Sequence, residues 1–351
     1  GVTGIKGCIV ITGTAGNGKS SAIKRVALRL SAAGHHVGWI DRYTEVPPYN
    51  IRDNMSQSSG PSLLMIDDAD TFGSELSSLI RDVCTCDRHP LVVIAMRSSR
   101  VDKVINRAQL AEVPVSEVVV PGLADTDIDG LIDVLGREKK LGELVGKTRL
   151  QMHNLFEKKC GRQLLVAMIE VTSGFPFEQK VVSEHDDLET EAQRVYALVA
   201  VATALRFTLT KSDILLGVGE VNNKVINAIQ QLERRQIIVS CCSGDSYQSR
   251  HRVIAEVVFN NLVRTGRLAE VLLGLAIAAA GQVPVGVFVA TKARRMLQRV
   301  INHDFLLKTI GLDETRNFYG RLEDLLKGDF NYWLHRGCAE VENNNVPHAE
   351  L

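Results

Sequence analysis

The chain has 351 residues, 45% of them hydrophobic and 23% charged, so a packed core is feasible and intrinsic disorder is excluded as a general description. Lys and Arg number 41, as do Asp and Glu, so the chain lacks the field of a dedicated nucleic-acid-binding protein. This length predicts about two to four small domains. The seven cysteines are odd in number and form no CxxC pair, which argues against a disulfide framework or a structural zinc site and favours a cytoplasmic protein with reduced thiols.

The ends of the chain and one apolar stretch bear on whether the protein is secreted or crosses a membrane. The sequence has no signal-peptide pattern and begins without Met, so we expect a piece of a longer protein. Residues 271–291 carry no charge and are long enough to span a bilayer. Gly281, Gln282 and Pro284 interrupt that stretch, so we expect two buried helices joined by a turn and no contact with a membrane.

The first third of the chain alternates apolar runs with amphipathic patterns, which predicts a parallel α/β sheet covered on both faces. The first predicted helix, residues 19–33, places Ile23, Val26, Ala27 and Leu30 on one side and ends at Gly34. A second helical stripe runs from residue 72 to residue 83. The expected strands are residues 8–12, 37–40, 62–66, 91–96 and 117–120.

Residues 13–20 fit the pattern G-x-x-x-x-G-K-[ST] between a predicted strand and a helix start. Glycines let backbone N–H groups surround phosphates without Cβ clashes, and the helix N-terminus adds its positive dipole end. Lys19 is expected to reach the β- and γ-phosphates, and the Ser20 hydroxyl to bind Mg2+. A chance glycine turn is the alternative. The pattern predicts an ATP and Mg2+ site whose nucleotide contacts are Gly13, Thr14, Ala15, Gly16, Asn17, Gly18, Lys19, Ser20 and Ser21.

The apolar run Leu-Leu-Met-Ile at residues 63–66 is followed by Asp67 and Asp68. An acid at such a strand end lies next to the Mg2+ position, so Asp67 is expected to hold the metal and Asp68 to orient or deprotonate the attacking water. The alternative is structural, because Asp68 or Asp70 could cap the following helix.

Arg97 follows the fourth predicted strand, which should lie beside the strand that precedes residues 13–20. An Arg at that place can contact the γ-phosphate and report its presence. A surface Arg at a strand end is the alternative, and Arg100 is the substitute candidate. The catalytic prediction is therefore Lys19, Asp67, Asp68 and Arg97.

Beyond Gly122 the pattern becomes helical. Thr126 with Asp129 resembles a capping box, and helices are expected to continue to residue 172. The acidic run at residues 184–189 is the best candidate for a linker with a solvated surface. Residues 191–260 then predict three helices and a hairpin, with the second helix capped by Thr210 and Asp213. This succession is typical of a winged helix, which can bind DNA or lock domains together.

His251 and Arg252 end the predicted hairpin. A side chain there could reach the nucleotide if the winged helix folds back over the sheet, although a lone His is more often a satisfied surface or core residue. In the helical remainder, Trp333, Gly337 and Ala349 match positions 4, 8 and 20 of a tetratricopeptide repeat, so we expect the start of such an array.

Together these residues resemble the STAND class of P-loop NTPases, the signal-transduction ATPases with numerous domains. The residues that carry the resemblance are the glycine-rich loop, the strand ending in Asp67 and Asp68, Arg97, and the helical and winged-helix succession. The segment 161–165 resembles the GLPL motif of that class, with Gln163 in place of the Pro that contacts the nucleotide, and His251 loosely resembles the winged-helix His.

The resemblance implies an ASCE-type α/β P-loop domain (1–123), a small helical domain (124–185), a winged helix (186–265) and a tetratricopeptide-like helical tail (266–351). It implies a slow regulatory ATPase that forms a homo-oligomer on activation and switches on an effector outside this chain. A protein trigger would be sensed by repeats outside the chain, and prokaryotic relatives suggest antiviral defence. Nucleic-acid binding is not expected of this segment.

Two other functions remain open from the sequence. An AAA+ loader or initiator ATPase would share the same motifs and add a DNA-binding winged helix, which predicts a basic recognition helix near residues 222–235. Lys224 and Arg234 occur there together with Glu233 and apolar residues. A STAND transcription regulator, with its DNA-binding domain elsewhere, is the third hypothesis.

Overall fold

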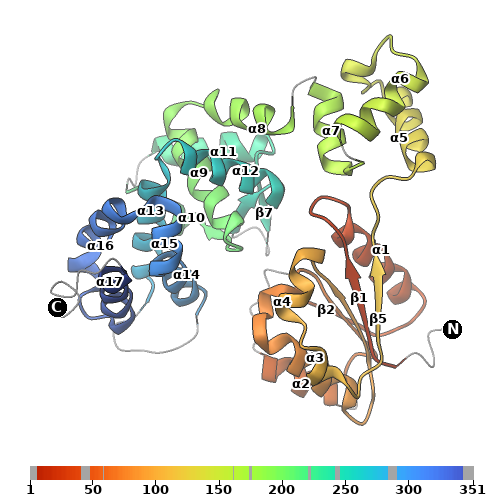
Figure 1. Cartoon of the computed structure of the whole chain (residues 1–351), viewed down its shortest axis with the longest axis horizontal. Helices are drawn as coiled ribbons and strands as arrows, with labels where there is room; N and C mark the ends of the chain where they lie inside the picture. Colours follow the sequence, from red (N-terminus) through yellow and green to blue (C-terminus); the bar gives the residue numbers. More distant parts are fainter. Residues whose placement is uncertain are drawn as a thin grey trace. The chain divides into compact units, whose positions relative to one another are not determined.

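The computed structural model describes residues 6–40, 48–57, 59–160, 162–173, 176–219, 223–241, 246–283 and 291–342. The chain divides into two units, Gly1–Phe177 and Glu178–Leu351, which are described separately. Figure 1 shows the elements of both along the sequence. Among the described residues, no helix combines the length and the apolar character that a membrane crossing requires.

The first unit contains a five-stranded sheet with the order β2-β3-β4-β1-β5, in which all strand pairs are parallel. The predicted strands occur with ends shifted by at most two residues. The strand that leads into residues 13–20, β1, lies between β4 and β5, as the interpretation of Arg97 required. The strand bounds are β1 Cys8–Thr12, β2 Val37–Ile40, β3 Leu63–Ile66, β4 Leu91–Ala95 and β5 Val115–Val119.

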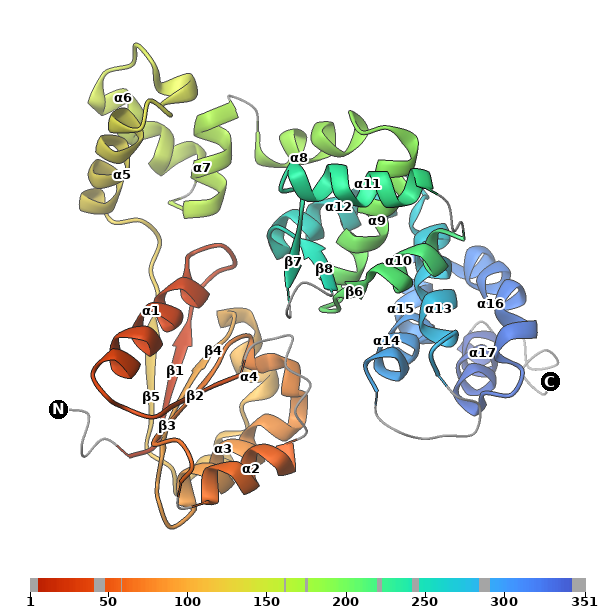
Figure 2. The same ribbon diagram turned by 180° about the vertical axis from the view of Figure 1, so that it is seen from behind.

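Helices cover both faces of this sheet over its inner strands (Figures 1 and 2). On one face, Ile23 of α1 (Lys19–Ala32) packs with Met65 and Val93. On the other, α2 (Pro48–Ser56) and α3 (Leu76–Thr85) bury their apolar residues against the sheet. The stripe predicted for α1 was wrong in one member, because Val26 is 46% exposed.

The expectation that every strand is covered was wrong for β5. All five of its residues are exposed, including Val118 and Val119. β5 forms the edge of the sheet, and its apolar residues are therefore exposed, whereas those of the inner strands β3 and β4 are buried.

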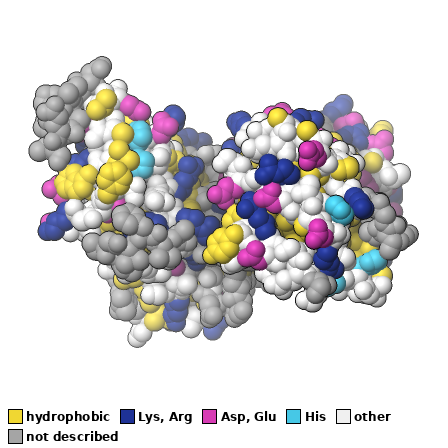
Figure 3. Space-filling view, turned by 90° about the horizontal axis from the view of Figure 1, so that it is seen from below, with side chains coloured by type: hydrophobic (Ala, Val, Ile, Leu, Met, Phe, Trp, Pro, Cys, Tyr) yellow, Lys and Arg dark blue, Asp and Glu magenta, His cyan; other side chains and the backbone are white. Residues whose placement is uncertain are grey.

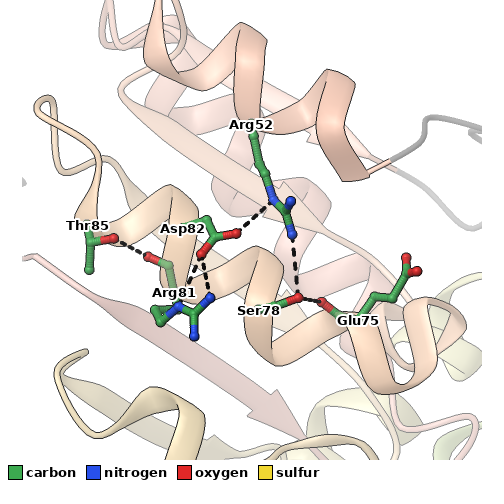
Figure 4. Close-up of polar contacts among 6 residues, drawn as sticks. All are labelled: Arg52, Glu75, Ser78, Arg81, Asp82 and Thr85. Atoms are coloured by element: carbon green, nitrogen blue, oxygen red, sulfur yellow. Dashed lines mark hydrogen bonds and ion pairs between the residues drawn. The ribbon is translucent and has the colours of Figure 1, made fainter.

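A polar network holds α2 against α3 (Figure 4). The Nε of Arg52 lies 3.0 Å from an Asp82 carboxylate oxygen, and another nitrogen of its guanidinium donates to the Ser78 hydroxyl. Ser78 in turn donates to the backbone carbonyl of Glu75, and Arg81 donates to Asp82. These contacts are half-exposed, so they orient the two helices while the apolar residues beneath supply most of the stabilisation.

The small helical region consists of α5 Asp125–Arg137, α6 Arg149–Asn154, a π-helical turn at Leu155–Lys159 and α7 Leu164–Ser173. The predicted capping box of Thr126 and Asp129 was wrong. The N-cap is Ala124, whose backbone N–H donates to the Asp127 carboxylate. The helix therefore starts two residues earlier, next to Leu123, whose backbone N–H donates to the carbonyl of Arg162.

The boundary between the units follows Phe177, the first residue of α8 (Phe177–Asp186), so the linker predicted at residues 184–189 was wrong. His185 and Leu188 are buried, and Glu184 forms an ion pair with Arg250. Asp186, Asp187 and Glu189 are exposed, so the run is solvated as expected, but it lies within the second unit and does not connect two units.

Three helices and a small antiparallel sheet follow, as the pattern predicted. Thr210 accepts from the Asp213 backbone N–H, and Asp213 accepts from that of Thr210, so the predicted cap of α10 is confirmed. The sheet order is β6-β8-β7. The bounds are α9 Thr190–Ala204, β6 Leu209–Thr210, α10 Lys211–Val218, α11 Asn223–Arg234, β7 Ile238–Cys241, β8 Ser246–Ser249 and α12 Arg252–Arg264.

The helical remainder comprises α13 Leu268–Ala280, α14 Lys292–Val300, α15 His303–Ile310, α16 Leu312–Leu326 and α17 Phe330–Glu342. The uncharged stretch breaks after Gly281, the C-cap of α13, as predicted. The second helix expected in that stretch falls on residues 284–290, which lie outside the described residues. Trp333 and Gly337 lie in α17, whereas Ala349 lies outside the described residues. The described cysteines are free thiols, and burial raises the pKa of Cys84 to about 12, in agreement with inert thiols.

Candidate nucleotide-binding site

The glycine-rich loop, residues 13–20, connects β1 to α1 at the carboxyl end of the sheet. Gly16 and Gly18 have φ of 84° and 85°, a left-handed conformation that side chains with a Cβ rarely adopt. Gly18 is also the N-cap of α1, and its carbonyl accepts the first helical hydrogen bond, from Ala22. The loop therefore places the free N–H groups and the positive end of α1 at one point, where an anion is stabilised.

Lys19 lies inside this loop and is only 8% exposed. Its ammonium donates to the backbone carbonyl of Thr14 at 2.6 Å. Burial lowers the pKa of Lys19, while the carboxylate of Asp68 acts against that shift and the charge of Arg97 adds to it. Within the described part of the chain its partner is this neutral carbonyl, and a buried cation with a neutral partner is complementary to an incoming phosphate.

Ser20 and Asp67 come together where the loop meets β3. The Ser20 hydroxyl donates to Asp67 Oδ1 at 3.0 Å, and the Asp68 backbone N–H donates to the same oxygen. Asp67 is 3% exposed. Hard oxygen donors at this spacing suit Mg2+, which keeps several waters and uses one or two protein oxygens with substrate phosphates. Among the described residues no cluster of three His, Cys, Asp or Glu could hold a metal by itself.

Asp68 has φ of 48° and its side chain makes no capping hydrogen bond to the short helix that follows. The alternative reading of Asp68 as a helix cap is therefore not supported. Its charge is the largest favourable electrostatic influence on the ammonium of Lys19. Asp68 therefore lies close enough to the ammonium of Lys19 for their charges to interact.

The segment after β4 lies against the glycine-rich loop. Met96 donates through its backbone to Ile11, and Ser98 donates to the carbonyl of Gly13 at 3.3 Å. Arg97, between them, is half-buried and its charge acts on Lys19. These contacts bring Arg97 to the loop.

Arg100, the substitute candidate, has a different environment. Its Nε lies 3.7 Å from a carboxylate oxygen of Asp70, whose side chain is only 2% exposed. Asp70, considered from sequence only as a possible helix cap, thus links the segment after β3 to the segment after β4. This buried acid was missed because a single Asp in a turn carries no pattern.

Residues of the small helical region approach the loop from another side. A Cβ added to Gly16 would meet the Cβ of Leu165 at 3.0 Å, and Asn17 donates through its side chain to the carbonyl of Pro121. Gln163 directly precedes α7, and its carbonyl accepts from the Ala167 N–H, while Gly161 lies outside the described residues. Sequence reasoning named Gln163 but missed Leu165, which belongs to the same short motif.

Arg162 fixes this region to the segment after β5. Its backbone carbonyl accepts from the Leu123 N–H, and its guanidinium donates to the Leu123 carbonyl, Asp125 and Glu157. Hydrogen bonding to Arg162 lowers the pKa of the exposed Asp125 carboxyl.

His251 lies in the second unit. Its Nδ1 accepts from the Val253 backbone N–H, so the ring caps α12. The neighbouring Arg252 lies within ion-pair distance of Glu256. Within the second unit His251 therefore has a structural role as the N-cap of α12, and its contact with the nucleotide stays a prediction.

Comparisons with known proteins give one family match and several distant structural similarities. A family described as Novel STAND NTPase 5 matches residues 3–107. No similar protein was found among curated proteins. Similar solved structures include AMPPCP-bound DnaA from Aquifex aeolicus, with 14% identity and a TM-score of 0.33 over 66% of this chain and 83% of that chain. The Orc1 protein of Aeropyrum pernix in complex with DNA has 14% identity and a TM-score of 0.30 over 75% of this chain and 88% of that chain.

At these identities and TM-scores, the function of the solved structures cannot be assigned to this chain. The family match covers the sheet up to the segment after β4, which contains the glycine-rich loop, Asp67, Asp68 and Arg97. Residues 3–107 are therefore a P-loop ATPase domain of the STAND type.

Proposed function

We propose that the chain binds and hydrolyses ATP with Mg2+ at the glycine-rich loop and serves as the nucleotide-operated switch of a STAND signalling protein. The observation that carries this proposal is the 3.0 Å contact of Ser20 with Asp67 beside the buried ammonium of Lys19. A scaffold would not need a hydroxyl, a carboxylate and a buried cation at one helix start.

Each residue has a role that follows from its place. The backbone N–H groups of residues 13–18, with Ser21 at the start of α1, surround the phosphates, and Lys19 exchanges the Thr14 carbonyl for phosphate oxygens. Ser20 and Asp67 hold Mg2+, which neutralises charge on the phosphates when bound. Asp68 orients the attacking water and accepts its proton, and Arg97 contacts the γ-phosphate.

The switch follows from differential binding. A ligand shifts a conformational equilibrium only if it binds one state better. Contact of Arg97 with the γ-phosphate supplies that difference between ATP and ADP. In this proposal the second unit contains a winged helix and the start of a tetratricopeptide-like tail. ATP binding favours a homo-oligomer, and the homo-oligomer activates an effector outside the chain. Antiviral defence is the role that the resemblance to prokaryotic relatives supports.

The test compares nucleotide binding and hydrolysis in wild type and two variants. Wild-type protein should bind a fluorescent ATP analogue and release phosphate in a Mg2+-dependent manner. Asp68→Asn should retain binding and hydrolyse more slowly by about tenfold or more, since a positioned base contributes about 10²–10⁴-fold. Glu75→Gln, an exposed acid outside the site, is the control. Equal hydrolysis by Asp68→Asn and the control would remove Asp68 from the mechanism.

A second candidate function, DNA binding, is favoured by one observation. The apolar residues of α11 face inward, and its exposed positions are Asn223, Lys224, Asn227, Gln230 and Arg234. Figure 3 shows basic and acidic side chains interspersed on one face of the molecule. Against DNA binding, α11 contains Glu233 beside Arg234, and the chain has as many acidic as basic residues. Duplex DNA binding that weakens steeply with salt, and that Lys224→Ala reduces, would favour this function.

A further inference from the structure

A cavity of about 300 Å³ lies in the first unit, on the face of the sheet opposite α1. It is bounded by β1, β5, α4 (Val101–Val104) and the following segment up to Val113. The nucleotide site does not use it. Its apolar lining consists of Val10, Val101, Ile105, Leu110, Val113 and Val115.

The inner wall of the cavity is buried and the outer wall is open. Val10 and Leu110 are 3% and 4% exposed, whereas Val115 on the edge strand is 43% exposed. The opening lies at β5, the strand whose residues are all exposed. A small molecule could therefore enter from solvent and place an apolar group against the buried wall.

Two opposite charges, Arg107 and Glu117, complete the lining. Both are exposed, and among the described residues no ion pair joins them. One carboxylate oxygen of Glu117 accepts from the hydroxyl of Thr12 at 3.0 Å, which holds the side chain in place. Thr12 is fully buried on the same face of β1 as Val10. The cavity therefore has a fixed anion and a separate cation at the opening, above an apolar interior.

We propose that this cavity binds a small zwitterion with an apolar side chain, the chemistry of a free α-amino acid such as leucine. The ligand carboxylate pairs with Arg107, its ammonium with Glu117, and its side chain fills the apolar interior. A volume of about 300 Å³ is at the lower end of ligand pockets, so it suits a molecule of this size and excludes a nucleotide.

The experiment is calorimetric titration of the whole chain with four probes. L-leucine carries every feature, 4-methylpentanoate lacks the ammonium, 3-methylbutylamine lacks the carboxylate, and glycine lacks the apolar group. Leucine should bind at least about tenfold more tightly than glycine, because the burial of an apolar side chain is worth at least that factor. It should bind about twofold to fivefold more tightly than 4-methylpentanoate and 3-methylbutylamine, because an exposed charge pair contributes up to about 1 kcal/mol. Equal binding of leucine and 3-methylbutylamine by wild type would overturn the assignment.

Variants locate the binding. Arg107→Gln should abolish the preference for leucine over 3-methylbutylamine, and Val115→Trp should weaken leucine binding about tenfold or more by filling the opening. Lys103→Gln, an exposed change on α4 outside the lining, is the control. Nucleotide binding by each variant reports that the domain is folded. Absence of leucine binding to wild type, or binding that both variants leave intact, would overturn the proposal.

Discussion

Replacing Lys19 by Met removes one charge from the glycine-rich loop and keeps the length of the side chain. In the structure the ammonium bonds the Thr14 carbonyl, and Thr14 is exposed, so that carbonyl can bond water instead. Burial lowers the pKa of Lys19, which means that folding disfavours its charged form. We therefore expect Lys19→Met to leave the stability of the nucleotide-free protein unchanged or slightly raised.

The effect on nucleotide binding is expected to be large. Lys19 would donate to two phosphate groups, and a hydrogen bond to a charged group contributes about 1.5–3 kcal/mol. Loss of two such bonds amounts to about 3–6 kcal/mol, which weakens ATP binding by roughly 10²–10⁴-fold.

Thermal unfolding with and without Mg2+ and ATP measures both effects. At a nucleotide concentration of about 100 times Kd, wild type gains about 2.7 kcal/mol, and a domain of this size should melt roughly 5–11 °C higher. The variant should show no such shift at the same concentration. A nucleotide-induced shift equal to that of wild type would refute the phosphate assignment. A large drop in the nucleotide-free melting temperature would refute the argument from burial.

Three further outcomes can be measured. Asp67→Asn and Ser20→Ala should each reduce the gain in ATP affinity that Mg2+ provides by about tenfold or more, since each variant loses one metal contact. ATP titration with and without Mg2+ measures that gain. An unchanged gain in either variant would mean that the metal binds elsewhere. Arg97→Ala should reduce the preference for ATP over ADP by about tenfold. Arg100→Ala should keep that preference and lower the unfolding free energy by about 0.5–1 kcal/mol, because a half-exposed ion pair with Asp70 is lost. Competition binding and denaturant unfolding distinguish the two variants, and the reverse result would exchange the two roles. Burial lowers the pKa of Lys19 in the folded protein below its ordinary 10.5, so the unfolded chain binds that proton more tightly. The free energy of unfolding of wild type should therefore rise as pH increases from the folded pKa to 10.5. A Lys19→Met protein whose free energy of unfolding rises equally with pH over that range would contradict the lowered pKa of Lys19.

The strands, the glycine-rich loop and the acids after β3 could be predicted because each depends on neighbours in sequence. An apolar run of four or five residues predicts a buried strand, and the spacing of glycines with Lys19 and Ser20 specifies its chemistry locally. The cap of α10 was predictable for the same reason, since Thr210 and Asp213 lie one turn apart. The cap of α5 was not, because contacts between Leu123 and Arg162, distant in sequence, select the helix start.

By itself, the sequence determined that a P-loop ATPase domain exists, which residues form its loop and which acids follow β3. Only the tertiary structure decided that Arg97 lies against the loop while Arg100 pairs with Asp70, that Leu165 approaches Gly16, and that β5 is an exposed edge beside a cavity. The physical reason is that motif spacing is a short-range property of the chain. Strand order and the surroundings of a side chain arise from contacts between segments far apart in sequence, which apolar periodicity does not encode.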